Sequence, residues 1–171
     1  MKENPMREIR VEKVTLNMGC GSDQDKLKRA VKLLNILTGQ KPLITRTKKR
    51  TTFGMAQKKS IGVKVTLRND KAEKFLKDAL SVVDKELKEG QINDGNFSIG
   101  IKEYIDLPNI NYDPEIGIMG MDVSVTLERP GFRVKRRRFK KSKVGKKHLI
   151  SKDETIEWLK KKFGVRISGG G

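Results

Sequence analysis

Apolar and polar residues alternate in four segments of the chain, and this period of two predicts β-strands. The segments are residues 9–18, 61–67, 97–101 and 121–127, and a shorter strand is predicted at residues 42–45. In the first segment the alternation shifts by one position between Val11 and Val14, which predicts a bulge or bend there. In the first, second and fourth segments the alternate positions are polar. One face of these strands is therefore expected to point away from the core.

A different spacing, with apolar residues every three or four positions, predicts three helices. The first is expected over residues 22–39, with Ser22 as its N-cap and a glycine at its end. The second is expected over residues 69–90, also ended by a glycine. The third is expected over residues 151–164, where Ser151 opens a capping box.

The alternation of strands and helices indicates the α+β class, with a mostly antiparallel sheet. The helices are expected to pack on one face of the sheet, and the other face is expected to be open to RNA. Residues 1–129 and 149–167 are predicted to form a single α+β RNA-binding domain. Residues 130–148 are predicted to be a basic arm inserted before the last helix, and residues 168–171 a frayed C-terminus.

The charge is concentrated in two stretches that contain no acidic residue. The chain carries 39 Lys and Arg against 21 Asp and Glu, a formal charge of +18. Residues 41–59 hold seven of the basic residues and residues 131–147 hold ten, which leaves 22 basic and 21 acidic elsewhere. Such local charge favours a polyphosphate partner. Nucleic acid is preferred to an anionic membrane, because neither stretch has the broad apolar face of an amphipathic helix.

Length and composition indicate how many domains the protein has and in which compartment it is found. The 171 residues suit one ordinary domain, and no apolar run approaches the roughly 20 residues of a membrane span. The N-terminus lacks the apolar centre of a secretion signal. The single cysteine, Cys20, excludes an internal disulfide and is typical of a reducing cytosol. A cytoplasmic protein is therefore expected.

Little in the sequence indicates catalysis. The only histidine, His148, cannot assemble a site of several histidines, and Cys20 is better read as a small apolar side chain after a strand. The glycines of Gly19-Cys20-Gly21 precede a helix, as in a phosphate-binding turn, but Asp23 and Asp25 would repel a phosphate. We expect no enzyme, no cofactor and no metal site.

Binding residues are easier to identify. In the first basic stretch, threonine hydroxyls and cations surround Phe53, a combination that suits phosphate, ribose and base contacts. The second stretch repels itself, and its charges are expected to find no partner within the chain. It should therefore be mobile in the free protein and become ordered against RNA. The polar strand face with Lys64, Thr66 and Arg68 reads equally well as an RNA platform or as a solvated face.

Six blocks of sequence resemble one known family. These are VEKVTLNMGCG, LTGQKPLITRTKK, the Phe53-Gly54 loop, IGVKVTLR, GNFSIGIKEYID and GMDVSVTLERPGFRVKRRR. Together they resemble the universal 5S-rRNA-binding protein of the large ribosomal subunit, called ribosomal protein five in bacteria and eleven in eukaryotes. The resemblance runs from Asn4 to about Val165. The basic segment after ERPG resembles the archaeal and eukaryotic branch, and the short termini favour an archaeal member.

The expected contact residues form three groups, drawn partly from the resemblance and partly from the basic stretches themselves. The resemblance maps 5S rRNA contacts to Asn17, Gln40, Phe53 and Thr66. The basic stretch and the polar strand face add Thr45, Arg46, Lys48, Lys49 and Lys64. A loop facing peptidyl-site tRNA maps to Gly54, Met55, Ala56, Gln57, Lys58 and Lys59. The rRNA-binding arm is expected to use Arg133, Lys135, Arg136, Arg137, Arg138, Lys140 and Lys141.

The family implies a structural constituent of the central protuberance that holds 5S rRNA beside 23S rRNA. Neighbouring 5S-binding ribosomal proteins and tRNA are implied as further partners. Two other functions stay open from the residues themselves. A DNA-binding chromatin-type protein would bind duplex DNA and structured RNA with similar affinity. An RNA-modifying enzyme would need a cofactor pocket or a catalytic cluster, and the sequence offers neither.

Overall fold

A computed structural model describes residues 4–48, 50, 56–108 and 110–168. The strands within this part are β1 (Arg10–Gly19), β2 (Leu43–Arg46), β3 (Ser60–Leu67), β4 (Glu86–Lys88), β5 (Ile92–Asn93), β6 (Asn96–Ile101), β7 (Met121–Glu128) and β8 (Arg166–Ser168). The α-helices are α1 (Gln24–Thr38), α2 (Asn69–Val82), α3 (Arg133–Arg136) and α4 (Lys152–Phe163). Short 3-10 turns lie at Pro5–Arg7, Glu89–Gln91, Tyr104–Asp106 and Lys146–His148.

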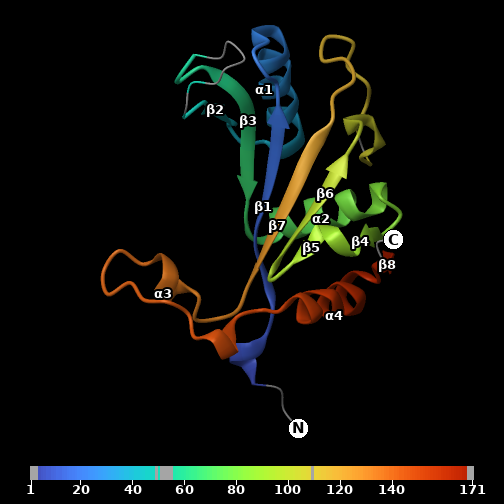
Figure 1. The fold of residues 1–171 in the computed structure, drawn as a ribbon. Helices are drawn as coiled ribbons and strands as arrows, with labels where there is room; N and C mark the ends of the chain where they lie inside the picture. Colours follow the sequence, from blue (N-terminus) through green and yellow to red (C-terminus); the bar gives the residue numbers. More distant parts are fainter. Residues whose placement is uncertain (1–3, 49, 51–55, 109, 169–171) are drawn as a thin grey trace. The chain divides into compact units, whose positions relative to one another are not determined.

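Six of the described strands form one sheet in the order β2-β3-β1-β7-β6-β5. The sheet is mostly antiparallel, and neighbouring arrows in Figure 1 point in opposite directions. The predicted α+β class is confirmed. A separate parallel pair joins β4 to β8, with Leu87 opposite Ile167.

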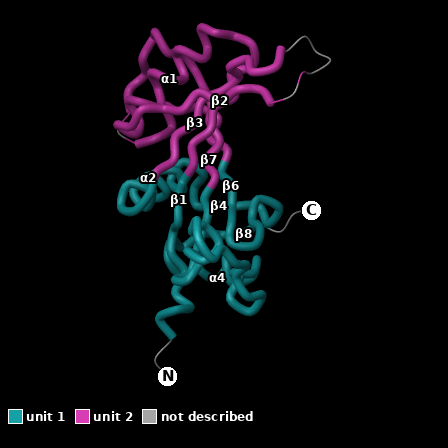
Figure 2. The backbone as a smooth tube through the Cα atoms, turned by 90° about the vertical axis from the view of Figure 1, so that its left-hand side faces the viewer, with its two compact units in different colours: residues 1–14, 68–99, 125–171 teal, residues 15–67, 100–124 magenta. Residues whose placement is uncertain are grey.

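The chain divides into two compact units, which Figure 2 shows in different colours. The first comprises residues 1–14, 68–99 and 125–171, and the second comprises residues 15–67 and 100–124. We call them unit 1 and unit 2. The predicted division into one domain with an inserted arm stays a prediction.

The core of unit 2 follows directly from the two periodicities. Leu16 and Met18 of β1 are buried at alternate positions, as are Val63 and Val65 of β3. Helix α1 packs against β3 and buries the apolar stripe Leu27, Ala30, Leu33 and Leu34. Burying each leucine, valine or methionine of this core contributes about 1.5–3 kcal/mol. The polar positions of the same strands are thereby directed away from α1.

The ends of α1 are set by local hydrogen bonds and backbone freedom. The N-cap is Asp23 and not the expected Ser22, so that prediction is wrong by one residue. The Asp23 carboxylate accepts the backbone N–H groups of Asp25 and Lys26 at 2.9 and 3.1 Å. These bonds lower the pKa of Asp23, and its charge suits the positive end of the helix dipole. Gly39 ends the helix as predicted, in the left-handed conformation at φ 61°.

Helix α2 is shorter than its apolar pattern predicted. It ends at Val82, and the expected continuation to Gly90 is wrong. Asp84 and Lys85 both have positive φ, and the Lys85 N–H donates to the Leu80 carbonyl at 2.9 Å. This turn reverses the chain, so Leu87, which continues the helical stripe in sequence, is buried in β4 instead.

Helix α4 begins with the predicted capping box, in which Ser151 and Glu154 bond to each other's backbone N–H. It ends at Gly164, as predicted, with φ 65°. The chain then continues into β8, whose last residue is Ser168. The expected frayed end is therefore wrong for Ser168, because β4 supplies a pairing partner from far away in sequence. Residues 169–171 lie outside the described residues.

Candidate nucleic-acid interface

Three neighbouring strands of unit 2 present polar side chains on one face. In β1, Asn17 lies between the buried Leu16 and Met18 and is exposed. In β3, Lys64 and Thr66 alternate with buried valines and are half-buried. Since successive side chains of a strand point to opposite faces, these three residues lie opposite the side on which α1 packs.

Strand β2 adds Thr45 to the same face. Its antiparallel register with β3 places Thr45 opposite Gly62 and Leu43 opposite Lys64. Directly opposite residues share a face, so Thr45 and Lys64 lie together there. Leu43 is 61% exposed on that face. The neighbouring Arg46 is exposed at the end of the strand.

Gly62 allows the strands to approach one another beneath these side chains. A Cβ atom added to it would lie 2.7 Å from the backbone oxygen of Met18 and 3.0 Å from Thr45 Oγ1. Neither atom can move without shifting a strand or displacing the threonine. The position therefore requires glycine for close approach and not for its backbone freedom.

Gly62→Ala should lower the free energy of unfolding by about 1–3 kcal/mol, the usual cost of forcing extra atoms into a packed site. Denaturant unfolding measures the change. Gly19→Ala is the matched control, because an added Cβ there would have no neighbour within 4 Å. Equal destabilisation of both variants would contradict the steric argument, since only Gly62 has the close backbone oxygen.

Gln40 follows the C-cap of α1 and is half-buried. Its backbone N–H donates to Thr38 Oγ1 at 3.3 Å, and that hydroxyl donates to the Leu34 carbonyl at 2.6 Å. The end of the helix thus holds the Gln40 backbone in place. Gln40 and β2 are separated by only two residues, so the turn leads directly into the basic stretch.

Strands β2 and β3 are the legs of a hairpin that carries the first basic stretch, and we call it the basic hairpin. Thr47 closes its base through four hydrogen bonds. Its backbone N–H donates to the Lys59 carbonyl at 2.9 Å, and its carbonyl accepts from Lys58 at 3.0 Å. Its hydroxyl donates to the Ala56 carbonyl at 2.8 Å and accepts the Lys59 N–H at 3.1 Å. The sequence marked Thr47 only as one hydroxyl among several, because its partners are 9 to 12 residues away.

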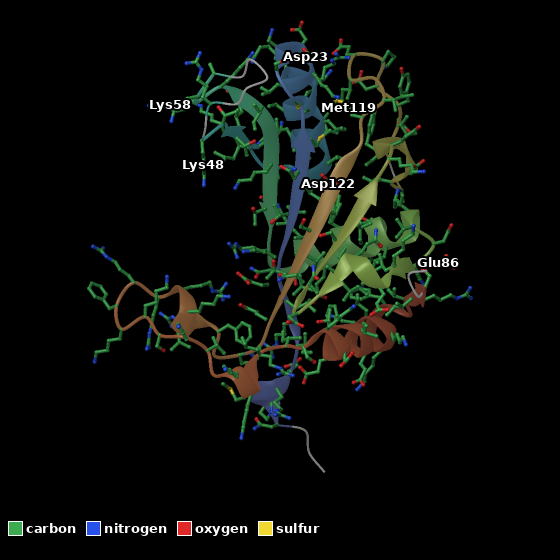
Figure 3. The ribbon with its side chains drawn as sticks, viewed as in Figure 1. Asp23, Lys48, Lys58, Glu86, Met119 and Asp122 are labelled. Carbon is green, nitrogen blue, oxygen red and sulfur yellow. The ribbon has the colours of Figure 1, made fainter. Side chains whose placement is uncertain are left out.

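The expected tRNA-facing residues lie partly in this hairpin. Lys58 and Lys48 are exposed, and Figure 3 shows both side chains on the side of the hairpin away from α1. The Gln57 side chain donates to the Lys48 carbonyl at 3.1 Å, which ties the two legs together. Ala56 is exposed and Lys59 half-buried. The predicted residues Lys49, Phe53, Gly54 and Met55 lie outside the described residues.

The basic arm, residues 130–148, belongs to unit 1 and leaves β7 to return at α4 (Figure 1). Its two legs are joined to each other. The His148 ring bonds to the Pro130 carbonyl at 2.9 Å and packs edge-on against Phe132, with ring centres 5.7 Å apart. Farther out, the Ser142 N–H donates to the Val134 carbonyl at 3.2 Å.

The arm cation Arg136 is paired within the described part of the chain. Arg136 contacts both Glu12 and Glu128 at 2.5 Å. The Glu12 side chain is only 11% exposed and also lies 3.6 Å from Lys13 and 3.9 Å from Arg68. The expectation that the arm's charges find no partner within the chain is wrong for Arg136, because β1 and β7 supply two carboxylates next to the base of the arm. The mobility of the arm without RNA stays a prediction.

The other predicted arm residues are exposed. Arg133, Lys135, Arg137, Arg138, Lys140 and Lys141 present their charges to solvent. Arg137 has one internal bond, from its Nε to the Lys140 carbonyl at 2.8 Å. The arm is therefore a cationic surface with an ordered base.

A buried arginine fixes both ends of the arm. Arg129 is 4% exposed, and its guanidinium donates to the carbonyls of Arg7, His148 and Leu149 at 3.1–3.4 Å. It also pairs with Glu154 at 2.8 Å. Burial acts to raise the pKa of Glu154, but hydrogen bonds from Arg129 and the Ser151 N–H outweigh it and lower the pKa. Nothing in the sequence marked this role, since Arg129 looked like one more basic residue beside the arm.

Two features of the sequence were considered for catalysis or phosphate binding, namely Cys20 and the glycine turn before α1. Cys20 is buried, and burial raises the pKa of its thiol. The helix terminus after Gly21 is already capped by Asp23. Among the described residues, no group of three or more His, Cys, Asp or Glu side chains is placed to hold a metal ion. No helix in that part of the chain combines the length and apolar character needed to cross a bilayer.

Comparison with known families gives two matches that together span most of the chain. The family model for ribosomal protein L5 matches residues 4–52. The model for the ribosomal L5P family C-terminus matches residues 60–158.

Individual relatives are similar over almost their whole length. The chain is 50% identical to large ribosomal subunit protein uL5 of Nanoarchaeum equitans over 167 residues, covering 96% of this chain and 99% of the relative. It is 50% identical to the protein of the same name in Archaeoglobus fulgidus, covering 92% and 89%. For Sulfurisphaera tokodaii the identity is 49%, covering 98% and 96%. These organisms are archaea, the branch that the short termini favoured, and the basic segment after ERPG is likewise typical of the archaeal and eukaryotic members.

Proposed function

The chain belongs to the ribosomal protein L5 family in its archaeal form, and from this premise we propose that it anchors 5S rRNA in the large ribosomal subunit. The proposed site is the polar face of β1, β2 and β3 in unit 2, together with the basic hairpin. The arm of unit 1 binds adjacent 23S rRNA. The protein acts in the cytoplasm as a structural part of the ribosome, and no catalytic step is assigned to it.

One observation carries the proposal. Residues that are far apart in sequence, Asn17, Thr45 and the pair Lys64 and Thr66, lie on one face of three adjacent strands. That face combines amide, hydroxyl and ammonium groups, and the basic hairpin continues from it. Amides and hydroxyls suit ribose and base edges, whereas the cations neutralise phosphates.

Further partners are proposed from the family to which the chain belongs. The hairpin loop, which includes Gln57 and Lys58, is proposed to face peptidyl-site tRNA. Neighbouring 5S-binding ribosomal proteins are proposed to share the central protuberance. The predicted contact residues Lys49, Phe53, Gly54 and Met55 belong to this proposal on the basis of the sequence.

Asn17→Ala, Gln40→Ala and Thr66→Ala should each weaken 5S rRNA binding, while the fold stays intact. Loss of one hydrogen bond costs on the order of 1 kcal/mol, or about fivefold in affinity, and more where an RNA group is left unpaired. Titration with labelled 5S rRNA measures the affinity, and thermal melting measures the stability. Asn35→Ala, on an exposed position of α1, is the matched control and should bind normally.

Two outcomes would count against the assignment. Variants that melt early yet bind normally once folded would make these residues structural. Equal affinity of the wild-type chain for random duplex DNA and 5S rRNA would favour the chromatin-type alternative, in which phosphate charge alone determines binding.

A further inference from the structure

Phe139 lies near the tip of the arm and is 76% exposed. It is the only large hydrophobic side chain of residues 130–148 that is exposed, and the structure describes all of these residues. The other arm phenylalanine, Phe132, is half-buried against His148 at the base. The two aromatic residues therefore differ in role, because Phe132 packs at the base of the arm, whereas most of the Phe139 side chain is exposed to solvent.

We propose that Phe139 and Arg138 form a stacking site for a single unpaired base of ribosomal RNA. This inference rests on the proposed RNA-binding function of the arm and adds a specific contact to it. A phenyl ring offers a flat face to any base, and base–aromatic stacking is a common source of affinity for single-stranded RNA. A guanidinium beside the ring adds a cation–π contribution.

The geometry around Phe139 is suited to this role. The Arg138 guanidinium carbon lies 5.4 Å from the centre of the Phe139 ring. The turn that carries both residues is held by the bond from Arg137 Nε to the Lys140 carbonyl at 2.8 Å. Lys140 itself has φ 48°, which makes the turn tight. The ring is thus presented on a shaped loop, so less ordering is needed when a base arrives.

Space for a base lies next to the ring. A hollow of about 540 Å³ opens on this side of the arm, and it is lined by Gly131, Arg133, Val134, Arg137, Arg138 and Phe139. Three of these residues are arginines and none is acidic. An occupant with a flat apolar face and a phosphate attached to it matches this lining.

The positive charge around Phe139 indicates which kind of ligand fits the site. No acidic residue occurs from Arg129 to Lys152, so the occupant must be anionic. An anionic membrane is a poorer match, because one phenylalanine gives little apolar area for insertion and the arm has no amphipathic helix beyond the four residues of α3. RNA provides both the charge and the flat apolar ring.

Phe139→Ala in the full chain should lower affinity for a single-stranded RNA of about ten mixed nucleotides by roughly 10-fold, within the 1–3 kcal/mol typical of one stacked base. Its affinity for a duplex RNA of the same length should change little, because paired bases are not available to stack. Phe139→Trp should retain the wild-type affinity, whereas Phe139→Leu, which is apolar but not flat, should not. Salt titration of Phe139→Ala should give the wild-type slope, since no phosphate contact is lost.

Lys141→Ala is the matched control on the same loop. It should weaken single-stranded and duplex RNA alike and should reduce the slope of log affinity against log salt by about 0.7–0.9 for one phosphate contact. A direct signal is available from Phe139→Trp, because a base stacked on the introduced indole ring quenches its fluorescence. Trp158 is present in both proteins, so the difference from wild type reports on position 139.

The results separate this inference from the function on which it rests. If the wild-type chain binds neither RNA, the proposed function fails. If it binds both and Phe139→Ala matches wild type on single-stranded RNA, the stacking site is wrong while the function stands. Full rescue by Phe139→Leu, or a Phe139-dependent affinity for phosphatidylcholine–phosphatidylserine vesicles that exceeds the affinity for RNA, would also overturn the stacking site.

Discussion

Neutralising five exposed cations of the arm should reduce affinity for large-subunit rRNA on the order of 1,000-fold at about 50 mM salt. The variant replaces Arg133, Lys135, Lys140, Lys141 and Lys143 with glutamine. These side chains are exposed. Arg136, Arg137 and Arg138 are retained because the first pairs with two carboxylates, the second bonds to the turn and the third lies over Phe139.

The physical reason is counterion release. Each phosphate neutralised by a cation frees condensed ions, so the slope of log affinity against log salt grows by about 0.7–0.9 per contact. The wild-type chain should therefore lose orders of magnitude in affinity between roughly 50 and 200 mM salt, and the fivefold variant should show a much flatter dependence. Binding isotherms over this salt range measure both effects.

A charge-matched control uses five exposed lysines on helices α2 and α4, replaced with glutamine at Lys71, Lys74, Lys77, Lys160 and Lys161. It has the same net charge as the arm variant. Its salt slope should stay near the wild-type value, because these lysines lie outside the proposed interface. Equal loss in the two variants would mean that total charge, and not the placement of charge in the arm, governs binding.

Glu154→Gln should lower the free energy of unfolding by about 1–3 kcal/mol, since it leaves the buried charge of Arg129 without a counter-charge, although solvent screens the half-exposed carboxylate and three carbonyls still accept from Arg129. The glutamine retains an oxygen for the Ser151 N–H, so the capping box of α4 is preserved. Denaturant unfolding measures the change. Glu157→Gln, at an exposed position of the same helix, removes the same charge and should change stability by less than about 0.5 kcal/mol.

A double-mutant cycle tests the pairing itself. Arg129→Met alone should also destabilise the chain, because three backbone carbonyls lose their donor. In that background, Glu154→Gln should cost much less than in the wild type, since no buried cation remains to be compensated. Costs that simply add would show that the two side chains act independently.

The pH dependence gives a further readout of the same pair. The pKa of Glu154 is lowered in the folded chain, so its contribution to stability is fully present above the ordinary carboxyl value near 4.5 and is lost as the pH falls through the folded value. In Arg129→Met the cation that holds this pKa down is gone. The acid-induced loss of stability in this pH range should therefore be smaller in that variant.

Local sequence patterns predicted those features that depend on neighbouring residues. The capping box at Ser151 and the glycine ends of α1 and α4 are local hydrogen-bond and backbone preferences, and each was confirmed. The strands were found because residues two apart share a face. The same rule indicated which positions of β1 and β3 would be polar, and the family resemblance then proposed what they bind.

The predictions from sequence were wrong where one local pattern was compatible with two different structures. Ser22 and Asp23 are both good N-caps, and the structure uses the aspartate, which bonds two backbone N–H groups. Leu87 fits the apolar stripe of α2, yet the turn at Asp84 and Lys85 directs it into β4. The pairing that stabilises this arrangement comes from β8, Arg166–Ser168, and no local pattern contains it.

For the candidate site, the residue types and the clustering of charge were determined by the sequence alone. Tertiary structure decided which residues meet. Thr45 and Lys64 share a face only because of the β2–β3 register, and Gly62 is needed only because the Met18 backbone lies so close to it. The sequence counted Arg129 and Arg136 as ordinary cations, but burial and carboxylates from distant segments make them structural. Net charge is a property of composition, whereas the pairing of a charge depends on which distant segments the fold brings within a few ångströms.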